Sequence, residues 1–481
     1  MVPVSRILRR SVLLVTLALA ACTNRGPELG DIQQLNAEAG SLGRFLLPYY
    51  NGIVALPDGG AVAVWMEQTG GFRPFFVSRA DGPTASFALR EPLSPKEYLD
   101  TISTGPGIVQ GPGAQQIGVG WQARRPRTGD KYLFFRGSAD GGRTWSETKQ
   151  FNNQLTSFAA RLAADRSGGV FAAWSDERAT AREVYFNRSL DAGATWLPEE
   201  IKVESGVERV SLEGAVSVAS DGDERVLLVW SEREARGRVI RAALSEDRGA
   251  SFLPAVRVDD GSGRSAPMAP IAAFAGRRAV VAWITAAAGA EIFSQVWADT
   301  SADGQAWGTD LLVRDQPGAP APTVNLTSGG ERAHLVFDVA TRGRDSEAVF
   351  HTAADAAGNW TPSTESLTAV SPENGHYRSP NLTRDANGTL YLVYEEKAQR
   401  IHLTRSKDGG ATWAPAMVVY ERNPEAPEAT IKLPQVAAAN GVAYVLWEEW
   451  GDVRRVVKTL GDLKDKRAPG DLFVRRVTFR D

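Results

Sequence analysis

The feature that most constrains the fold of this chain is a short apolar run ending in an aromatic residue, which recurs along the sequence. The eight runs end at Trp65, Trp121, Trp174, Trp230, Trp283, Phe337, Tyr394 and Trp447. Successive aromatic residues are separated by 53 to 57 positions. A period of this length, kept along the chain, indicates a repeat architecture in which each copy packs on its neighbours.

Each repeat has the pattern of four short strands. An apolar segment precedes each run, a third strand such as EVYFNRS or RIHLTRS follows it, and a fourth lies beyond a turn. This pattern predicts an all-β chain, a β-propeller of four-stranded antiparallel blades. Eight repeats favour eight blades, with six or seven as alternatives. Either residues 472–479 or residues 29–36 are expected to complete the last blade and close the ring, which hides the sheet edges.

A turn motif follows the third strand of most repeats. Residues 138–145 read SADGGRTW, and related segments occupy residues 189–196 and 406–413. Weaker copies lie at residues 245–252, 301–307 and 353–360, with remnants at 78–81 and 461–462. In such a turn the aspartate accepts backbone N–H groups, glycine supplies a positive φ, and tryptophan covers the hairpin.

These turns resemble the Asp-box, or BNR repeat, of the sialidase superfamily of β-propellers, and the resemblance covers residues 42–481. It implies a propeller fold, and six blades are typical of sialidases in that superfamily. It also implies a glycan-related function, although the turns themselves are scaffold and lie far from active sites.

The N-terminal segment has the features of an export signal. Arg6, Arg9 and Arg10 precede an apolar stretch that is too short to span a bilayer as a stable helix. It ends in Leu-Ala-Ala-Cys22, which resembles the lipobox of bacterial lipoproteins. The resemblance implies a signal peptide at residues 1–21, a lipid on Cys22, a tether at residues 22–41 and the propeller at residues 42–481. The alternative is a secretory signal with an unrelated cysteine.

A lipidated Cys22 predicts an extracytoplasmic protein anchored to a membrane of the cell envelope. By analogy with lipoproteins, Thr23 after the cysteine implies the outer membrane in an organism with two membranes. Loss of the three leading arginines leaves 51 basic residues against 57 acidic ones. We therefore expect the lipid, and not surface charge, to hold the protein on the membrane.

Composition excludes several classes of function. The 54 basic and 57 acidic residues leave no basic excess, so a nucleic-acid partner is not predicted. One cysteine and four histidines supply neither a disulfide nor an evident metal cluster. The sequence therefore predicts no metal and no cofactor.

Acidic residues stand two positions after the aromatic residue in five repeats: Glu67, Asp176, Glu232, Glu396 and Glu449. Repeat symmetry predicts that they surround the central funnel, where carboxylates bind sugar hydroxyls or cations, or act as general acid and base. The alternative is that nearby basic residues neutralise them in local ion pairs.

The seventh repeat contains Tyr377-Arg378-Ser379-Pro380 and is similar to the opening repeat of exo-sialidases. This similarity implies that Arg378 grips a substrate carboxylate, for which a guanidinium is well suited. Ser379 departs from the apolar residue of that family, and the following loop is shortened to residues 395–399. The alternative for Arg378 is a salt bridge between blades.

Other catalytic roles have only weak candidates in the sequence. Beside Arg378 they are Glu396, Asp176, Glu213 and Tyr50, with Tyr49 as a neighbour of the last. The hypothesis we favour is binding of a glycan or a protein partner on the funnel face. The alternatives are an exo-α-sialidase or related glycoside hydrolase, and a scaffold for an envelope complex. A sialidase needs three convergent arginines. A binding module is expected to expose aromatic residues at the rim, with Tyr98 in segment 91–104 and Trp450 as candidates.

Overall fold

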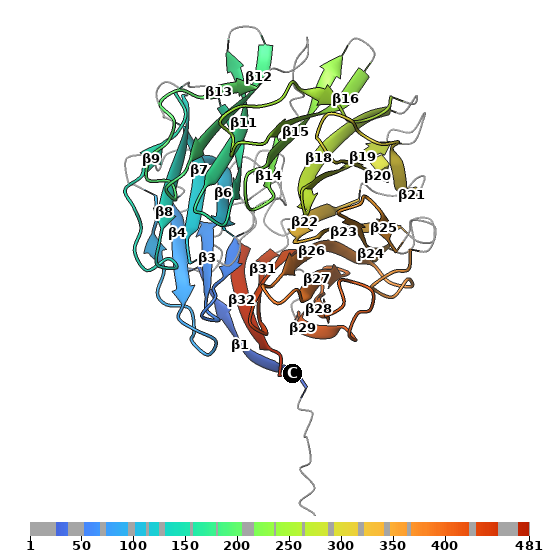
Figure 1. Cartoon of the computed structure of the whole chain (residues 1–481). Coiled ribbons are helices and arrows are strands. Elements are labelled where there is room, and N and C mark those ends of the chain that lie inside the picture. Colours follow the sequence, from blue (N-terminus) through green and yellow to red (C-terminus); the bar gives the residue numbers. More distant parts are fainter. Residues whose placement is uncertain are drawn as a thin grey trace, which may run out of the picture.

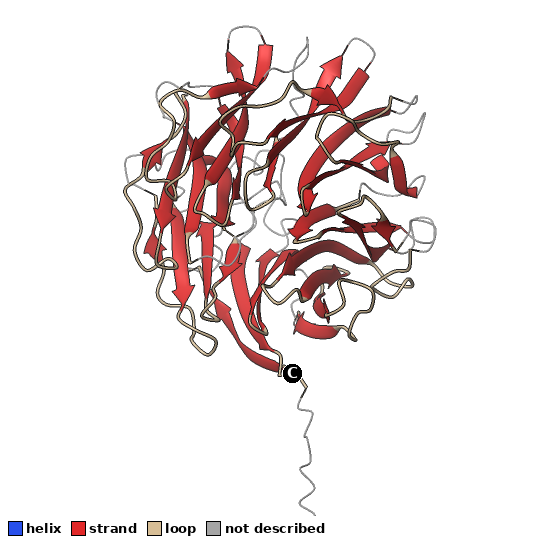
Figure 2. Ribbon diagram, in the orientation of Figure 1, coloured by secondary structure: helices blue, strands red, loops and turns tan. Residues whose placement is uncertain are grey.

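The computed structural model describes most of the chain from residue 26 to residue 480, with short gaps. The described ranges are 26–36, 52–67, 74–94, 102–111, 115–124, 130–153, 157–178, 181–203, 216–234, 237–261, 265–286, 293–315, 322–340, 347–362, 367–422, 430–450 and 470–480. All regular structure in these ranges is β-strand (Figure 2). In the same ranges we find no helix of the length and apolarity that crossing a membrane requires.

The strands form eight four-stranded sheets arranged radially, which confirms an eight-bladed propeller (Figure 1). Blades 1 to 4 follow one another in the sequence. Their strands are β2 (Ile53–Ala55), β3 (Ala61–Met66), β4 (Phe75–Ala80) and β5 (Glu91–Pro92); β6 (Ile102–Gln110), β7 (Ile117–Arg124), β8 (Lys131–Ser138) and β9 (Lys149–Gln150); β10 (Ser157–Ala164), β11 (Val170–Arg178), β12 (Ala181–Ser189) and β13 (Ile201–Val203); β14 (Ser217–Ser220), β15 (Val226–Glu234), β16 (Gly237–Ser245) and β17 (Val256–Arg257).

Blades 5 to 8 continue the same order, which is inner strand, second strand, third strand, outer strand. Their strands are β18 (Ser265–Ala275), β19 (Arg278–Ala286), β20 (Phe293–Ser301) and β21 (Leu311–Asp315); β22 (Val324–Gly329), β23 (Arg332–Ala340), β24 (Glu347–Asp355) and β25 (Trp360–Thr361); β26 (Tyr377–Arg384), β27 (Leu390–Glu396), β28 (Arg400–Ser406) and β29 (Met417–Glu421); β30 (Thr430–Ala439), β31 (Val442–Trp450), β32 (Gly470–Thr478) and, from the other end of the chain, β1 (Glu28–Gln34).

Blade 8 joins the two ends of the described chain. Its strand order is β30-β31-β32-β1, so both segments that the sequence suggested for closing the ring are used (Figure 1). Glu28 pairs with Thr478 and Gln34 with Phe473, in antiparallel register. The propeller therefore begins at Glu28 and not at residue 42, and the predicted tether is correspondingly shorter.

The core lies between neighbouring blades. The second strands supply it, because they are covered on both faces: Trp174, Trp230, Trp283 and Trp447 are fully buried. One buried cluster joins residues of blade 8 to residues of blade 1, so the ring is packed as well as hydrogen-bonded at its closure.

The two ends of the propeller differ in what they carry. In blade 7 Arg384, at the end of the inner strand, pairs with Leu390, and Leu390 pairs with Ser406 at the start of the turn motif. The turn motifs thus lie at one end, which we call the turn end. At the opposite end, the loop end, the inner strands begin and the second strands finish, as the pairing of Tyr377 with Glu396 shows.

The turn motifs have the predicted hydrogen bonds. In blade 7 Thr412 donates to Asp408 from its backbone N (2.9 Å) and from its hydroxyl (2.5 Å). Ser406 donates from its hydroxyl to Asp408 and accepts from the backbone N of Gly410, which has a φ of +90°. The hydrogen bonds from Thr412 lower the pKa of Asp408 to about 2. The carboxylate is therefore a permanent acceptor that holds the turn.

Candidate functional site

A repeated β-bulge places two cations at the loop end of blades 7 and 8. In β26, Arg378 pairs with Glu395, and the register then slips before Asn381. In β30 it slips after Lys432, which pairs with Glu448.

Proline explains where these bulges occur. Ser379 and Leu433 have positive φ, of 54° and 52°, and each precedes a proline that cannot donate to the ladder. A bulge bends its strand and redirects the adjoining side chains. Arg378 is half exposed and Lys432 is exposed, so both cations reach solvent at this end.

Three carboxyl groups lie beside these cations, each one position after the aromatic residue of a second strand. They are Asp338 in blade 6, Glu395 in blade 7 and Glu448 in blade 8. Successive side chains of a strand point to opposite faces. The carboxyl groups one position after the aromatic residue therefore face away from the predicted acids, which lie two positions after it. Asp338 faces blade 7, because its Oδ2 accepts the backbone N of Ser379 (2.7 Å).

Burial raises the pKa of all three carboxyl groups. The pKa of Asp338 rises to about 6 although the backbone N–H groups of Thr323 and Ser379 oppose the rise. The pKa of Glu395 rises to about 7 against the attraction of the Arg378 guanidinium. The pKa of Glu448 rises to about 7 against a hydrogen bond from the Trp450 indole (2.7 Å). Near neutral pH this end of the molecule thus holds carboxyl groups that both gain and lose protons.

Glu395 differs from the other two because its Oε2 is buried and has no hydrogen-bond partner among the described residues. Its side chain is 8% exposed. Burying an oxygen of this kind without a partner costs about 1–3 kcal/mol. An unpaired buried acceptor close to an exposed guanidinium points to a ligand that would supply the missing partner.

Arg378 joins blade 7 to blade 6. Its Nε lies 2.7 Å from Oε2 of Glu347, the first residue of β24, and Nδ1 of His376 lies 3.7 Å from the same oxygen. The structure therefore shows an ion pair between blades, which was the alternative to a ligand contact. The ion pair occupies Nε, and the two terminal nitrogens of Arg378 have no partner among the described residues.

The five predicted acids are not brought together. Glu67 and Glu232 are buried, and each accepts the indole N–H of the tryptophan two positions before it, Trp65 (2.8 Å) and Trp230 (3.1 Å). Arg90 lies 3.3 Å from Glu67, and Arg241 lies 3.1 Å from Glu232.

The other three acids are engaged in their own places. Asp176 is fully buried on β11. Glu396 is bound by His402 (3.0 Å) and Arg400 (3.4 Å), which lower its pKa although burial opposes them. Glu449 accepts a hydrogen bond from Tyr420 of blade 7 (2.6 Å). Four of the five acids, Glu67, Glu232, Glu396 and Glu449, thus have local partners, where a shared ring around the funnel was expected.

The remaining predicted residues either lie outside the described ranges or are buried. Cys22, Tyr49, Tyr50, Tyr98 and Glu213 lie outside the described residues. Trp450 is 5% exposed and bonded to Glu448, so it is not the exposed rim aromatic that we expected. The cations acting on Glu395 are Arg378 and Lys432. One of these two cations is an arginine, whereas the resemblance to sialidases implies three.

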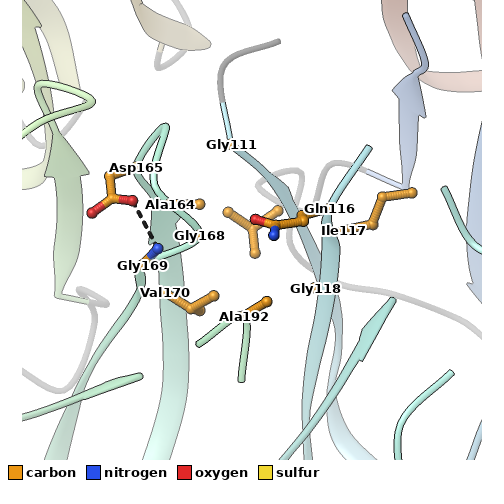
Figure 3. Close-up of a pocket in the computed structure, with 11 residues that line it drawn as sticks. Gly111, Gln116, Ile117, Gly118, Ala164, Asp165, Gly168, Gly169, Val170 and Ala192 are labelled. Atoms are coloured by element: carbon orange, nitrogen blue, oxygen red, sulfur yellow. Dashed lines mark hydrogen bonds between the residues drawn. The ribbon is translucent and has the colours of Figure 1, made fainter. Parts of the chain in front are cut away.

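A metal site is not evident in the described residues. They contain no group of three or more His, Cys, Asp or Glu side chains that could hold a metal ion. One small hollow, of about 10 Å³, lies between blades 2 and 3. Figure 3 shows residues that line it, among them Gln116, Asp165 and several glycines. It has room for about one water molecule and is too small for a sugar ring.

The sequence contains a signal for the new carboxyl groups that the repeat comparison missed. Blades 6, 7 and 8 are consecutive, and each has an acid directly after its aromatic residue: Asp338, Glu395 and Glu448. The first five repeats have Met66, Gln122, Ser175, Ser231 and Ile284 at that position. An acid confined to three neighbouring blades marks one sector of the ring, whereas the acids two positions after the aromatic are spread around it.

Comparison with known proteins finds only distant likenesses of structure. No family model and no curated protein matches the sequence. Solved structures that are similar include an ulvan lyase of polysaccharide lyase family 25 (9% identity, 93% of this chain and 94% of that chain, TM-score 0.49) and the polysaccharide lyase Uly1 (13%, 93% and 94%, 0.47). An α-L-arabinanase of Penicillium chrysogenum is also similar (17%, 69% and 99%, 0.38). Likenesses of this size say nothing about what this chain binds.

Proposed function

We propose that this protein is a lipid-anchored, extracytoplasmic propeller that binds a glycan at the loop end of blades 6 to 8. The observation that carries the proposal is the unpaired, buried carboxyl oxygen of Glu395 beside the half-exposed guanidinium of Arg378. Together they offer an acceptor and a set of donors at adjacent positions. The anchor would be the lipid on Cys22, with the outer membrane as the expected location.

Sugar hydroxyls match this arrangement because each hydroxyl both donates and accepts. One hydroxyl would donate to Glu395 while its neighbour accepts from the terminal nitrogens of Arg378. An acidic sugar would gain further from Arg378 and exposed Lys432, which together attract a carboxylate or sulfate. The ligand we favour is therefore a glycan that bears acidic groups.

A protein partner is the less favoured occupant of this sector. Protein interfaces concentrate their binding energy in apolar and aromatic anchors. The groups at the loop end of blades 6 to 8 are instead carboxyls and cations, and Trp450 is buried. Polar groups that converge on one place suit a polyhydroxylated ligand better.

Binding is tested by titrating the purified protein with neutral and acidic oligosaccharides in a calorimeter. We expect Arg378→Ala and Glu395→Gln to weaken glycan binding at least tenfold. Arg277→Ala is the matched control, because Arg277 is similarly exposed but interacts with Asp221 and Glu224 in the neighbouring blade 4. Absence of glycan binding by the wild type, or equal binding by all three variants, would contradict the proposal.

Glycoside hydrolysis is a second candidate, favoured by the pKa of Glu395 near 7. A carboxylic acid that keeps its proton at neutral pH can protonate a glycosidic oxygen as the C–O bond breaks. The cations acting on Glu395 are one arginine and one lysine, and this pair weighs against the arginine triad of a sialidase. Fluorogenic glycosides, sialosides included, test this candidate between pH 4 and 8. Turnover by the wild type that disappears in Glu395→Gln and persists in Arg277→Ala would establish it.

A further inference from the structure

Exposed apolar side chains gather around β1. The described residues include six exposed large apolar side chains: Leu29, Ile32, Leu89, Leu190, Leu312 and Val418. Leu29 and Ile32 belong to β1 itself, where they are 36% and 41% exposed. Since β1 is the outer strand of blade 8, these two side chains lie at the periphery of the ring.

Leu89 lies on the blade 1 side of β1. The backbone N of Phe87 donates to Oε1 of Gln33 in β1 (2.9 Å), and the Phe87 ring packs edge-on against Tyr444 of blade 8. Leu89 follows two residues later and is 94% exposed. The segment that carries Leu89 is therefore held against β1.

Val418 lies on the blade 7 side of β1. Arg475, which pairs with Ile32, donates from Nε to the carbonyl of Gly30 (2.8 Å) and from Nη1 to the carbonyl of Val419 (2.6 Å). One arginine thus ties the outer strand of blade 7 to β1, and the adjoining Val418 is 40% exposed. We call Leu29, Ile32, Leu89 and Val418 together the β1 patch.

The short segment between Cys22 and β1 indicates what covers this patch. Six peptide steps separate Cys22 from Glu28, and a fully extended chain of that length spans at most about 20 Å. A lipid on Cys22 would therefore hold the start of β1 within about 20 Å of the bilayer surface. Two of the four apolar side chains of the patch are within ten residues of that lipid in the sequence.

We propose that the β1 patch docks on the lipid bilayer to which Cys22 is anchored. This inference rests on the proposed lipid anchor and is independent of glycan binding. Side chains that lie apart on a convex edge can each enter the interfacial region of a bilayer, which has no fixed shape to match. Glu28 and Asp31 interrupt the patch, and this spacing of apolar groups suits a fluid surface better than a second protein, whose interface would have to pack closely.

Fluorescence quenching tests the docking. The lipidated full chain is purified from bacterial envelopes with one introduced cysteine, and a nitrobenzoxadiazole probe is attached to it. Cys22 is the only native cysteine, and its sulfur would be blocked by the lipid. The protein is reconstituted in phosphatidylcholine vesicles that contain a doxyl-labelled lipid, and probes at Ile32→Cys and Leu89→Cys are compared with one at Leu312→Cys.

Leu312 is the matched control because it is 37% exposed on an outer strand of blade 5, across the ring. We expect at least threefold stronger quenching at positions 32 and 89 than at position 312. Equal quenching at the three positions would overturn the proposal. So would quenching at none of them together with cross-linking between copies through position 32, which would assign the patch to a second copy. A chain without lipid on Cys22 by mass spectrometry would remove the anchor and the proposal with it.

Discussion

Position within the second strand decides what each acid of this propeller does. The acids two positions after the aromatic residue share a strand face with it, so Glu67 and Glu232 accept the indole N–H of Trp65 and Trp230. The acids one position after it lie on the other face and have raised pKa values. A shift of one residue thus separates structural carboxylates from those of the candidate site.

Glu395 is expected to make stability depend on pH near neutrality. Its pKa of about 7 in the folded state exceeds the ordinary value of 4.5, so the folded chain keeps a proton that the unfolded chain loses. The free energy of unfolding should therefore fall as the pH rises from about 4.5 to 7. Glu395→Gln should remove this contribution and stabilise the protein at pH 8 by about 3 kcal/mol.

Urea unfolding of the wild type and Glu395→Gln at pH 5 and pH 8 provides the measurement. A variant that is less stable than the wild type at pH 8 would show that the carboxylate is not strained. A stabilised variant that no longer binds glycan would instead indicate that the acid is kept for function at the expense of stability.

The buried pair His334 and His351 should have the opposite effect in acid. Their ring nitrogens are 3.2 Å apart, and burial lowers their pKa values to about 4 and about 3. The unfolded chain takes up protons below pH 6.5 that the folded chain refuses. The free energy of unfolding should therefore fall with decreasing pH, by about 1.4 kcal/mol per pH unit for each histidine.

His351→Leu tests this effect through the slope of stability against pH. The substitution removes a hydrogen bond and is expected to lower stability at pH 7. Between pH 6.5 and 4.5 its slope should nevertheless be shallower than that of the wild type. An unchanged slope would mean that the two histidines do not control the response to acid.

At the scale of elements, the sequence predicted most of what the structure contains. Aromatic-ended runs located the second strands, and the turn motifs located the hairpins after the third strands, because both are local patterns. Ring closure was left as two alternatives, since pairing between β1 and β32 joins segments more than 430 residues apart. Local patterns do not encode such a pairing.

Asn36 is expected to be important for the attachment of β1. It is 3% exposed, its amide oxygen accepts the backbone N of Leu472 (2.8 Å), and its amide nitrogen donates to Asp471 (2.9 Å). Asn36→Ala leaves a buried N–H without that partner, which should cost about 1–3 kcal/mol. Gln34→Ala is the control, because Gln34 donates to the same Asp471 from an exposed position (3.1 Å).

Thermal unfolding of the two variants measures this difference. We expect a clear decrease in Tm for Asn36→Ala. For Gln34→Ala we expect the free energy of unfolding to change by no more than about 0.5 kcal/mol. Equal effects of the two substitutions would mean that the backbone pairing of β1, and not the Asn36 side chain, stabilises this segment.

At the scale of the whole molecule, arginines at the turn end connect neighbouring blades. Arg248 of blade 4 contacts the buried Asp165 of blade 3 through Nε (2.9 Å) and Nη2 (2.6 Å). Arg166 of blade 3 contacts Asp223 of blade 4 at 2.8 Å, but both side chains are at least half exposed. The two bridges join the same pair of blades at different depths.

Burial should decide how much each bridge contributes. Arg248→Ala leaves the buried Asp165 charge without its guanidinium and should lower the free energy of unfolding by about 2 kcal/mol or more. Arg166→Ala should lower it by less than about 1 kcal/mol, because water screens an exposed pair. Denaturant titration compares the two, and a larger effect of Arg166→Ala would contradict this ranking.

The contacts between blades at the candidate site could not be predicted from the sequence. Arg378 was recognised from its motif, but its bond to Glu347 depends on how blades 6 and 7 face each other. The raised pKa of Glu395 likewise depends on burial by a neighbouring blade. Contacts between blades follow from the closed ring and not from any one repeat.

The pairing of β1 with β32 also sets the order of events during synthesis. The first strand of the propeller emerges from the ribosome some 440 residues before the partner with which it pairs. Until that partner arrives, the backbone donors and acceptors of β1 have no strand partner and are open to foreign strands. Synthesis must therefore deliver β32 before the ring closes, and a chain cut short before β32 would leave blade 8 incomplete and β1 without its partner.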